Sequence, residues 1–296
     1  MPQKFVCVAP VGDHCGEGAV WHSGERALYW TDINRFLIHR FDEATKSVRT
    51  WMFDEPVTAL TLTERDDTLI AIFGSKAQFW QPASNTLGRV LFRLPAWPTM
   101  RCNDARVDPR GSLWIGSMRN NVGVEGEELD VAFSEGVLYR VDPDGQVSEW
   151  KREVGISNTV AWSPGGDVFY FADTPTNIIY AFDYDISSGA ISRERPFLAG
   201  FERGLPDGSA VDSRGFLWNA RYGGGCVVGI APDGSVQRTI ELPVANATTC
   251  TFGGVDRRTL YITTAGMGPR LAGSLFAVTM DTEGMAENHF GLQTNG

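Results

Sequence analysis

Four side chains with oxygen donors occupy the same position in a stretch that recurs along this 296-residue sequence. They are Glu17, Asn103, Asn158 and Asp207, and each stands at the start of a short segment that leads into a Gly-containing turn. A turn alone would explain any one Asn or Asp. Four such donors at one recurring position favour a site for a hard divalent cation, which prefers carboxylate and amide oxygens.

Other metal and nucleophile chemistries are not indicated. His14, His22, His39 and His289 have no ligand spacing such as HExxH, and the cysteines at positions 7, 15, 102, 226 and 250 form no CxxC pair. The sequence also lacks a GxSxG nucleophile elbow, a GxxxxGK phosphate loop and a GxGxxG turn between a strand and a helix. The odd number of cysteines favours buried free thiols over a disulfide framework.

The oxygen donors belong to a repeated unit. From Leu205 to Gly225, in LPDGSAVDSRGFLWNARYGGG, a turn and a short strand are followed by a hairpin turn and an aromatic-rich strand. The same order occurs in residues 16–32, 102–118 and 157–173. Alternation of apolar and polar residues between turns is typical of paired antiparallel strands.

Six such units follow one another at intervals of about 40 to 55 residues, the range of four-stranded propeller blades. No segment has the 3.6-residue apolar period of a long helix. The sequence therefore predicts an all-β, six-bladed β-propeller that forms a single domain over residues 1–296. The run Lys4 to Ala9 is expected to complete the sixth sheet, which removes exposed strand edges. The units span residues 16–42, 56–83, 103–145, 157–185, 206–234 and 248–281.

This fold would bring the four oxygen donors together, because the innermost strands of all blades begin around one central channel. The stretch between Met118 and Gly136 is longer than its counterparts and is expected to form a loop inserted into the third blade.

Charge and composition limit the kinds of partner that the protein is expected to bind. The chain has 26 Lys and Arg against 36 Asp and Glu, a formal net charge of −10, and the basic residues are dispersed. Phosphate-backbone binding needs clustered basic residues, so no nucleic acid partner is expected. No apolar run approaches the roughly 20 residues of a membrane span, and MPQKFVCVAP lacks a signal-peptide core. We expect a soluble, cytoplasmic protein with a small-molecule ligand; the oligomeric state stays open.

Several of these motifs together resemble the family of six-bladed propellers formed by regucalcin (SMP-30), gluconolactonase and LRE. The resemblance covers the chain from about Cys7 to Ala277, and its motifs are specific in combination. It rests on GEGAVW from Gly16, RxND at residues 101–104, SNTVAWSPGG from Ser157, NIIYAFDYD from Asn177 and LPDGSAVDSRGFLW from Leu205.

The resemblance implies roles for individual residues. It implies that Glu17, Asn158 and Asp207 ligate one divalent cation and that Asp207 is also the catalytic acid and base. The first candidates for the cation are Ca²⁺ and Zn²⁺, and Mg²⁺, Mn²⁺ and Fe²⁺ are alternatives.

The resemblance also implies substrate-binding roles for Arg101 and Asn103. Where mammalian regucalcin has a substrate-binding Glu, the offset from MRNN places Asn121 in this chain. This departure bears on the sugar-facing contacts and on the preferred substrate.

The implied activity is that of a sugar lactonase, which hydrolyses an aldono-1,4- or 1,5-lactone to the aldonic acid without a protein nucleophile. The cation would polarise the lactone carbonyl, and Asp207 would take a proton from water and return it to the ring oxygen. Two alternatives stay open: an organophosphate hydrolase of the same fold, and a calcium-binding propeller that only holds an ion. Asp207 and Arg101 favour the enzyme, because a structural ion needs neither a spare proton acceptor nor a guanidinium.

Overall fold

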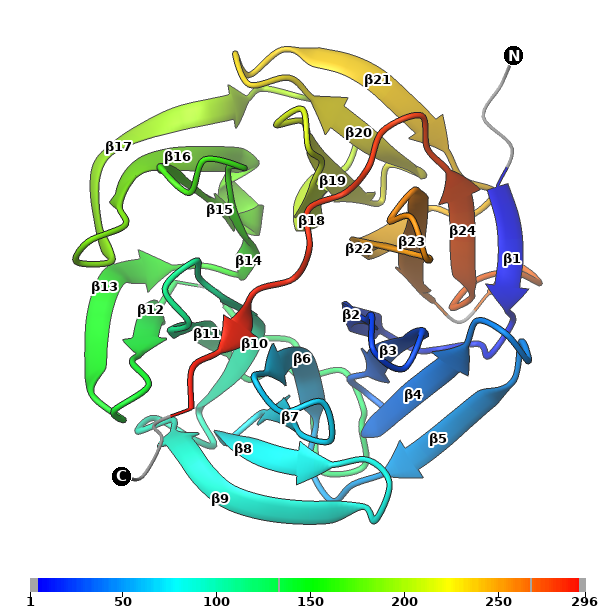
Figure 1. Cartoon of the computed structure of the whole chain (residues 1–296), viewed down its shortest axis with the longest axis horizontal. Coiled ribbons are helices and arrows are strands. Elements are labelled where there is room, and N and C mark those ends of the chain that lie inside the picture. Colours follow the sequence, from blue (N-terminus) through cyan, green and yellow to red (C-terminus); the bar gives the residue numbers. More distant parts are fainter. Residues whose placement is uncertain (1–4, 133, 267, 293–296) are drawn as a thin grey trace.

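The protein is a ring of six antiparallel sheets, seen end-on in the computed structural model (Figure 1). The structure describes residues 5–132, 134–266 and 268–292. In four of the sheets the strands are neighbours in the order of the sequence, starting from the innermost strand. In the other two, β1 (Phe5–Ala9) is added at the outer edge, beside β24, and β25 (His289–Phe290) pairs in parallel with the innermost strand β6. The predicted all-β, six-bladed β-propeller is confirmed.

Blade 1 contains β2 (Gly16–His22), β3 (Ala27–Asp32), β4 (Leu37–Asp42) and β5 (Val48–Met52). Blade 2 contains β6 (Val57–Thr63), β7 (Leu69–Phe73), β8 (Lys76–Gln81) and β9 (Thr86–Arg93). Blade 3 contains β10 (Met100–Val107), β11 (Leu113–Arg119), β12 (Gly136–Val141) and β13 (Val147–Val154).

Blade 4 contains β14 (Ser157–Trp162), β15 (Val168–Asp173), the 3-10 turn η1 (Thr174–Thr176), β16 (Ile178–Asp185) and β17 (Ala190–Ala199). Blade 5 contains β18 (Leu205–Val211), β19 (Leu217–Tyr222), β20 (Cys226–Ile230) and β21 (Val236–Glu241). Blade 6 contains β22 (Asn246–Gly253), β23 (Thr259–Ala265) and β24 (Leu275–Thr279). Within the described ranges, no helix is long and apolar enough to cross a membrane.

The two ends of the chain meet in blade 6. The N-terminal strand β1 (Phe5–Ala9) pairs antiparallel with β24, with Phe5 opposite Val278 and Val6 opposite Ala277. The predicted closure by the N-terminal run is therefore confirmed for residues 5–9, while Lys4 lies outside the described residues.

Every innermost strand has an irregular register close to its start. In β2 the register shifts between Glu17 and Val20, and in β18 it shifts between Pro206 and Ser209. The other four inner strands shift at the matching place, in residues 57–59, 102–105, 158–161 and 247–250. Extra residues of this kind bend a strand and redirect its side chains. The recurring polar positions of the sequence thus lie in or beside six matching irregularities.

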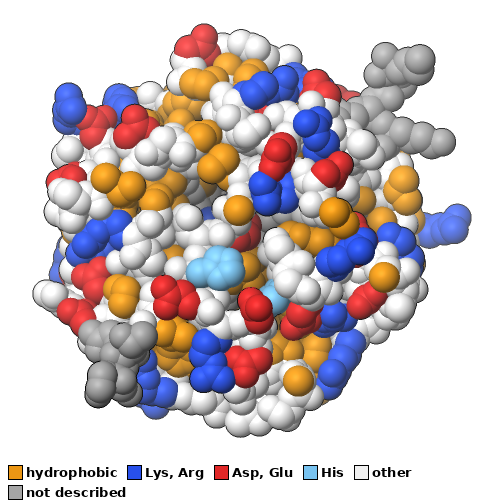
Figure 2. Space-filling view, viewed as in Figure 1, with side chains coloured by type: hydrophobic (Ala, Val, Ile, Leu, Met, Phe, Trp, Pro, Cys, Tyr) orange, Lys and Arg blue, Asp and Glu red, His pale blue; other side chains and the backbone are white. Residues whose placement is uncertain are grey.

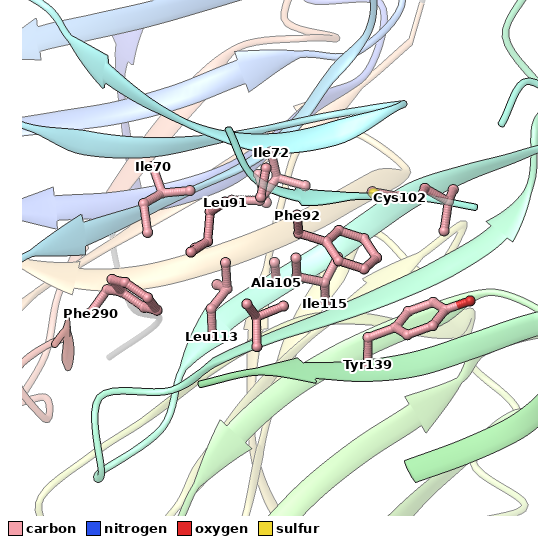
Figure 3. Packing of buried hydrophobic residues seen from close by; sticks show 14 of the residues in the cluster. Ile70, Ile72, Leu91, Phe92, Cys102, Ala105, Leu113, Ile115, Tyr139 and Phe290 are labelled. Carbon is pink, nitrogen blue, oxygen red and sulfur yellow. The ribbon is translucent and has the colours of Figure 1, made fainter. Parts of the chain in front are cut away.

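Apolar side chains fill the space between neighbouring blades. Figure 3 shows the cluster between blades 2 and 3, to which the C-terminal strand β25 (His289–Phe290) adds the ring of Phe290. Each fully buried aliphatic or aromatic side chain of this kind contributes about 1.5–3 kcal/mol. The cluster between blades 2 and 3 includes Ile70, Ile72, Leu91, Phe92, Cys102, Leu113, Ile115 and Tyr139.

The repeated aspartate of the hairpin turns connects the turn to the core. Asp108 accepts a 2.8 Å hydrogen bond from Trp114 Nε1, and Asp212 accepts one of 3.1 Å from Trp218 Nε1. Tyr184 of blade 4 also donates to Asp108, at 2.6 Å. The motif VD-x-x-G-x-L-W therefore fixes the hairpin, which explains its recurrence without a catalytic role.

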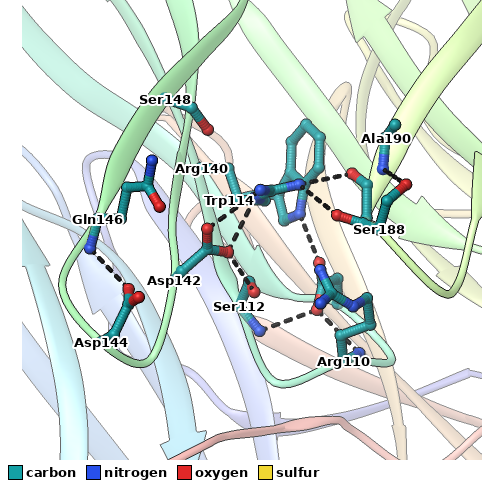
Figure 4. A network of polar contacts seen from close by, with 12 residues as sticks. Arg110, Ser112, Trp114, Arg140, Asp142, Asp144, Gln146, Ser148, Ser188 and Ala190 are labelled. Carbon is teal, nitrogen blue, oxygen red and sulfur yellow. Dashed lines mark hydrogen bonds and ion pairs between the residues drawn. The ribbon is translucent and has the colours of Figure 1, made fainter.

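A second polar network joins blades 3 and 4 (Figure 4). Asp142 accepts from Ser112 Oγ at 2.7 Å and pairs with Arg140 Nε at 2.9 Å. Arg140 also donates to the carbonyl of Gly189, 2.8 Å away in the β16–β17 turn. Asp142 is the first residue of the turn 142–145, in which Gly145 N donates to its carbonyl, so its contacts here are structural.

The C-terminal segment 282–292 crosses the propeller axis as a strap, drawn in orange-red and red in Figure 1. Its Met285 N–H donates to the carbonyl of Val211 at 2.9 Å, and β25 pairs in parallel with the end of β6. These contacts lie at the ends of inner strands, so the strap covers the end of the axis opposite to their starts. Figure 2 shows this face, where Lys and Arg side chains are interspersed with Asp and Glu.

The five cysteines are free thiols, as expected. Cys102, Cys226 and Cys250 are buried, whereas Cys7 and Cys15 are half-buried. The expectation of burial was wrong for these two, because Cys7 lies on the outermost strand of blade 6 and Cys15 directly precedes β2.

Candidate active site

Two buried carboxyl groups meet at the starts of β2 and β18. Glu17 and Asp207 are hydrogen-bonded to each other, and the N–H of Gly18 donates to Glu17 Oε2 at 2.9 Å. Burial, followed by the charge of Asp104, raises the pKa of Glu17 from 4.5 to about 8. Burial, followed by the charge of Glu17, raises the pKa of Asp207 well above its usual value. Two carboxylates so placed repel each other unless a proton or a cation lies between them.

Asn158 lies on the neighbouring strand β14, and its amide orientation is fixed. Its Nδ2 donates to Thr174 Oγ1 at 2.9 Å, and Thr174 in turn donates to the carbonyl of Pro206 at 2.7 Å. The amide oxygen therefore points away from Thr174, towards Asn103 Nδ2 at 3.1 Å. Thr174 thus connects the Asn158 amide to the strand that carries Asp207.

The residue after Asn158 has an unusual backbone. Thr159 has φ +54°, a left-handed conformation that is strained for a β-branched residue. Its hydroxyl donates to the main-chain carbonyl of Asp207 in the next blade. This hydrogen bond from Thr159 keeps the strained conformation in place. It also fixes the main chain at Asp207, one member of the carboxyl pair.

The three residues expected to bind substrate are in contact with one another. Arg101 Nε donates to Asn121 Oδ1 at 2.9 Å, and Arg101 Nη1 donates to Asn103 Oδ1 at 2.6 Å. Asn103 Nδ2 donates to the carbonyl of Ser157 at 2.8 Å, which fixes the orientation of this amide as well. The chain Asn121–Arg101–Asn103–Asn158 thus runs along the starts of β10 and β14.

The loop of residues 120–130 lies beside the starts of the inner strands and reaches from blade 3 to blade 1. It begins at the candidate site with Asn121, whose carbonyl accepts from Leu129 N at 2.9 Å. On the far side, Gly126 O accepts from Asn34 Nδ2 at 2.9 Å, and Glu128 Oε1 lies 3.1 Å from His14 Nε2. His14 is three residues before Glu17. The inserted loop therefore joins blade 3 to blade 1 on the side of the ring where Asn121 and His14 lie.

Sequence reasoning missed two groups that act on this site. Asp104 raises the pKa of both Glu17 and Asp207, although its own side chain bonds to Val160 N at 3.2 Å. Asp104 is part of the RxND pattern, which was the available signal. The sequence gave no signal for Thr174, because its role depends on a hydrogen bond with Asn158 that no recurring motif encodes.

A charged pair lies further along the axis, towards the strap. Arg106 of β10 has its Nε 3.8 Å from Glu287 Oε2, and Glu287 also accepts from Thr251 Oγ1 at 2.8 Å. A cavity of about 190 Å³ opens on the strap face beside these residues. None of the six site residues predicted from the sequence lines this cavity. The strap end of the axis is therefore separate from the candidate site.

The donor set at the carboxyl pair fits a hard cation. The described residues contain no group of three or more His, Cys, Asp or Glu placed to hold a metal ion. A cation beside Glu17 and Asp207 would therefore need the amide oxygen of Asn158, and oxygens from two carboxylates and an amide suit such ions. The shared hydrogen bond of the two carboxyls, with their raised pKa values, is what such a pair shows without a counter-ion.

The fold and this cluster define a class of protein: a six-bladed propeller with a buried oxygen-donor site at one end of its axis. Residues 15–266 match the family model described as SMP-30/Gluconolactonase/LRE-like region. The chain belongs to this family.

Two curated relatives and two solved structures show the extent of the similarity. The pentonolactonase XacC of Haloferax volcanii is 34% identical over 85% of this chain and 81% of its own. The 6-deoxy-6-sulfogluconolactonase of Pseudomonas putida is 33% identical over 98% of this chain and 99% of its own. A luciferin-regenerating enzyme superposes with a TM-score of 0.89 at 24% identity over 98% of this chain and 100% of its own. Regucalcin from Agrobacterium tumefaciens gives 0.89 at 24% identity, over 98% of each chain.

Proposed function

We propose that this protein is a metal-dependent sugar lactonase that hydrolyses an aldono-1,4- or 1,5-lactone to the aldonic acid. The observation that carries the proposal is the buried pair of Glu17 and Asp207. Thr174 joins Asn158 to the residue before Asp207, and the charge of Arg101 acts on Glu17. Relatives named as lactonases at 33–34% identity over most of the chain support a carboxylic ester hydrolase that acts on lactones.

Glu17, Asn158 and Asp207 would hold the divalent cation, with Ca²⁺ or Zn²⁺ as the first choices and Mg²⁺, Mn²⁺ or Fe²⁺ as alternatives. When bound, such an ion supplies Lewis-acid stabilisation to the oxygen of the lactone carbonyl. The amide side chains of Asn103 and Asn158 are already oriented by hydrogen bonds, so little ordering of these groups is needed when substrate arrives.

Asp207 is the residue that moves the proton. Its carboxylate accepts a proton from the attacking water, and the resulting acid returns it to the ring oxygen when the C–O bond breaks. Arg101 and Asn103 orient the substrate from the opposite side of the site, and the inserted loop limits access of bulk water. The overall reaction consumes one water and leaves a carboxylic acid and a hydroxyl group.

A calcium-binding propeller without activity is the alternative from another class. A structural ion would need Glu17, Asp207 and Asn158 but not the donors of Arg101, which are arranged beside them. An organophosphate hydrolase of the same fold is the alternative among enzymes. Assays of one aldonolactone and one fluorophosphate with the same cation distinguish these possibilities.

The test of the mechanism compares Asp207→Asn with Glu17→Gln. The amide of Asp207→Asn can still ligate a cation but cannot accept a proton near neutral pH, so kcat should fall by about 10²- to 10⁴-fold at any metal concentration. Glu17→Gln keeps the base and loses a ligand charge, so added metal should partly restore its activity. Asp233→Asn is the control, because Asp233 belongs to another PDG turn and accepts hydrogen bonds from Ser235 of the same turn.

Equal rescue of both variants by excess metal would show that Asp207 is only a ligand. Activity in Asp207→Asn that equals that of Asp233→Asn would show that the site lies elsewhere. Metal binding is measured by calorimetry on each variant, which separates loss of the ion from loss of the base.

A further inference from the structure

The guanidinium of Arg101 is buried among neutral partners. Only 5% of the Arg101 surface is exposed. Its Nε bonds the amide oxygen of Asn121, and its Nη1 bonds the amide oxygen of Asn103 and the carbonyl of Cys102 at 3.0 Å. Within residues 5–132, 134–266 and 268–292, no side chain or carbonyl bonds Nη2. Arg101 therefore has three neutral contacts, one free edge and no carboxylate in contact.

A buried guanidinium without a contacting carboxylate is energetically unfavourable. Arginine is almost never buried unless it is paired, because a desolvated charge needs a counter-ion. Desolvation lowers the pKa of Arg101 to about 10, and Glu17 is the carboxyl group that acts in the opposite direction. The carboxyl group of Glu17 is hydrogen-bonded to Asp207 and would also ligate the candidate cation. Arg221 is also buried with neutral partners, but its Nη2 is hydrogen-bonded, whereas the free edge of Arg101 can accept a negative charge from outside the chain.

We propose that the substrate supplies this charge, and that the protein prefers a sugar lactone carrying an anionic substituent over its uncharged counterpart. The proposal rests on the lactonase function proposed above and adds the substrate class. The anion would bond the free edge of Arg101, in the charge-assisted geometry that a guanidinium forms with carboxylate, sulfonate or phosphate oxygens.

Asn121 is the specificity-determining residue in this arrangement. A glutamate at this position would neutralise Arg101 within the protein and leave the site suited to neutral hydroxyl groups. The amide of Asn121 accepts the Nε hydrogen bond without adding charge. Asn121 therefore fixes the orientation of the Arg101 side chain but leaves its positive charge without a counter-ion.

The acidic residues of the inserted loop do not offset this preference. Glu125, Glu127, Glu128 and Asp130 give the loop segment negative charge. The side chain of Glu128 is 73% exposed and lies against His14. Exposed charges are screened by water and salt, whereas a contact with a buried guanidinium is not. The contact with Arg101 should dominate the selection.

The first experiment uses two lactones that differ only at C6. D-glucaro-1,4-lactone has a carboxylate there and D-glucono-1,4-lactone has a CH₂OH group. With the cation that gives the highest activity, kcat/KM should favour the carboxylate lactone by about 10²-fold, as expected for a buried charge pair. Equal values, or a preference for the neutral lactone, would overturn the inference and leave the lactonase function intact. A pentono-1,4-lactone checks that function, and no hydrolysis of any of the three would refute both.

The second experiment compares two variants at position 121 that have the same side-chain size and differ in charge. Asn121→Glu should lower the ratio of the two kcat/KM values by about 10²-fold, because Arg101 then has an internal counter-ion. Asn121→Gln is the matched neutral control and should keep the ratio of the wild type, whatever its absolute rate. If Asn121→Glu keeps that ratio, Arg101 does not recognise the charge and the proposal fails. The same lactone with a sulfonate or phosphate at C6 shows whether the preference is for charge or for carboxylate geometry.

Discussion

Without the proposed cation, the stability of this protein should fall as the pH rises, because the carboxyl groups of Glu17 and Asp207 are buried together. The pKa of Glu17 is 4.5 in an unfolded chain and about 8 in the folded protein. Between these values the folded state holds a proton that the unfolded state has released. Stability is therefore full below about pH 4.5 and is lost as the pH approaches 8. At 1.36 kcal/mol per pKa unit, Glu17 alone would cost roughly 5 kcal/mol.

This loss is large beside the 5–15 kcal/mol that usually separates folded from unfolded domains. Asp207 acts in the same direction, since its pKa is also raised. The assay is urea unfolding in a chelator at several pH values between 5 and 8, repeated with saturating cation. Cation should remove most of the pH dependence, because it replaces the proton between the carboxyls. Glu17→Gln in chelator should also flatten the curve.

The same free energy of unfolding at pH 5 and pH 8 in chelator would refute this reasoning. So would an equal pH dependence with and without cation. The first result would mean that the carboxyls are hydrated or apart in solution, and the second that the ion binds elsewhere.

Three further substitutions test the supports of the site. Thr174→Val removes the acceptor of the Asn158 amide and should weaken cation binding by about 10- to 100-fold in calorimetry. Gly208→Ala would place a Cβ 2.0 Å from Thr249 Oγ1 and should abolish activity and cost about 1–3 kcal/mol in urea unfolding. Phe290→Ala should cost about 3–5 kcal/mol in the same assay, since Phe290 is 1% exposed in the core between blades 2 and 3.

The inner part of each blade was predictable, whereas the outermost strand was not. The sequence units end at residues 42, 83, 145, 185 and 234 in the first five blades, and each of these blades has one more strand beyond that point. Those outer strands are largely exposed, as in β5 and β17. Exposed strands need no regular apolar alternation, so they lack the pattern by which the inner strands are recognised.

The residues around the candidate site likewise divide into those that the sequence predicts and those that it does not. Glu17, Asn158 and Asp207 were found because a repeat unit gave them equivalent positions, and Arg101 because its motif resembles a known family. The contact of Glu287 with Arg106 had no such signal, since the strap reaches the axis only after the ring has closed. Residues far from the repeat are brought to the channel by tertiary packing, which a periodic pattern does not encode.

The six register irregularities divide into two sets that alternate around the ring. In blades 1, 3 and 5 they lie at Glu17, Asn103 and Asp207, which have the side chains suited to chemistry. In blades 2, 4 and 6 they contain threonines whose hydroxyls donate to a carbonyl of the following odd-numbered blade. These bonds join Thr58 to Asn103, Thr159 to Asp207 and Thr248 to Gly16.

This alternation explains how a channel can hold charged groups rigidly. An irregular register leaves main-chain carbonyls without ladder partners, and a buried carbonyl without a partner is costly. The threonines satisfy these carbonyls from the neighbouring blade, directly at Asn103 and Asp207 and one residue before Glu17. The geometry of the candidate site therefore depends on residues that take no part in its chemistry. Blades 1, 3, 4 and 5 carry the site residues, and threonines of blades 2, 4 and 6 fix the backbone from which Glu17, Asn103 and Asp207 extend.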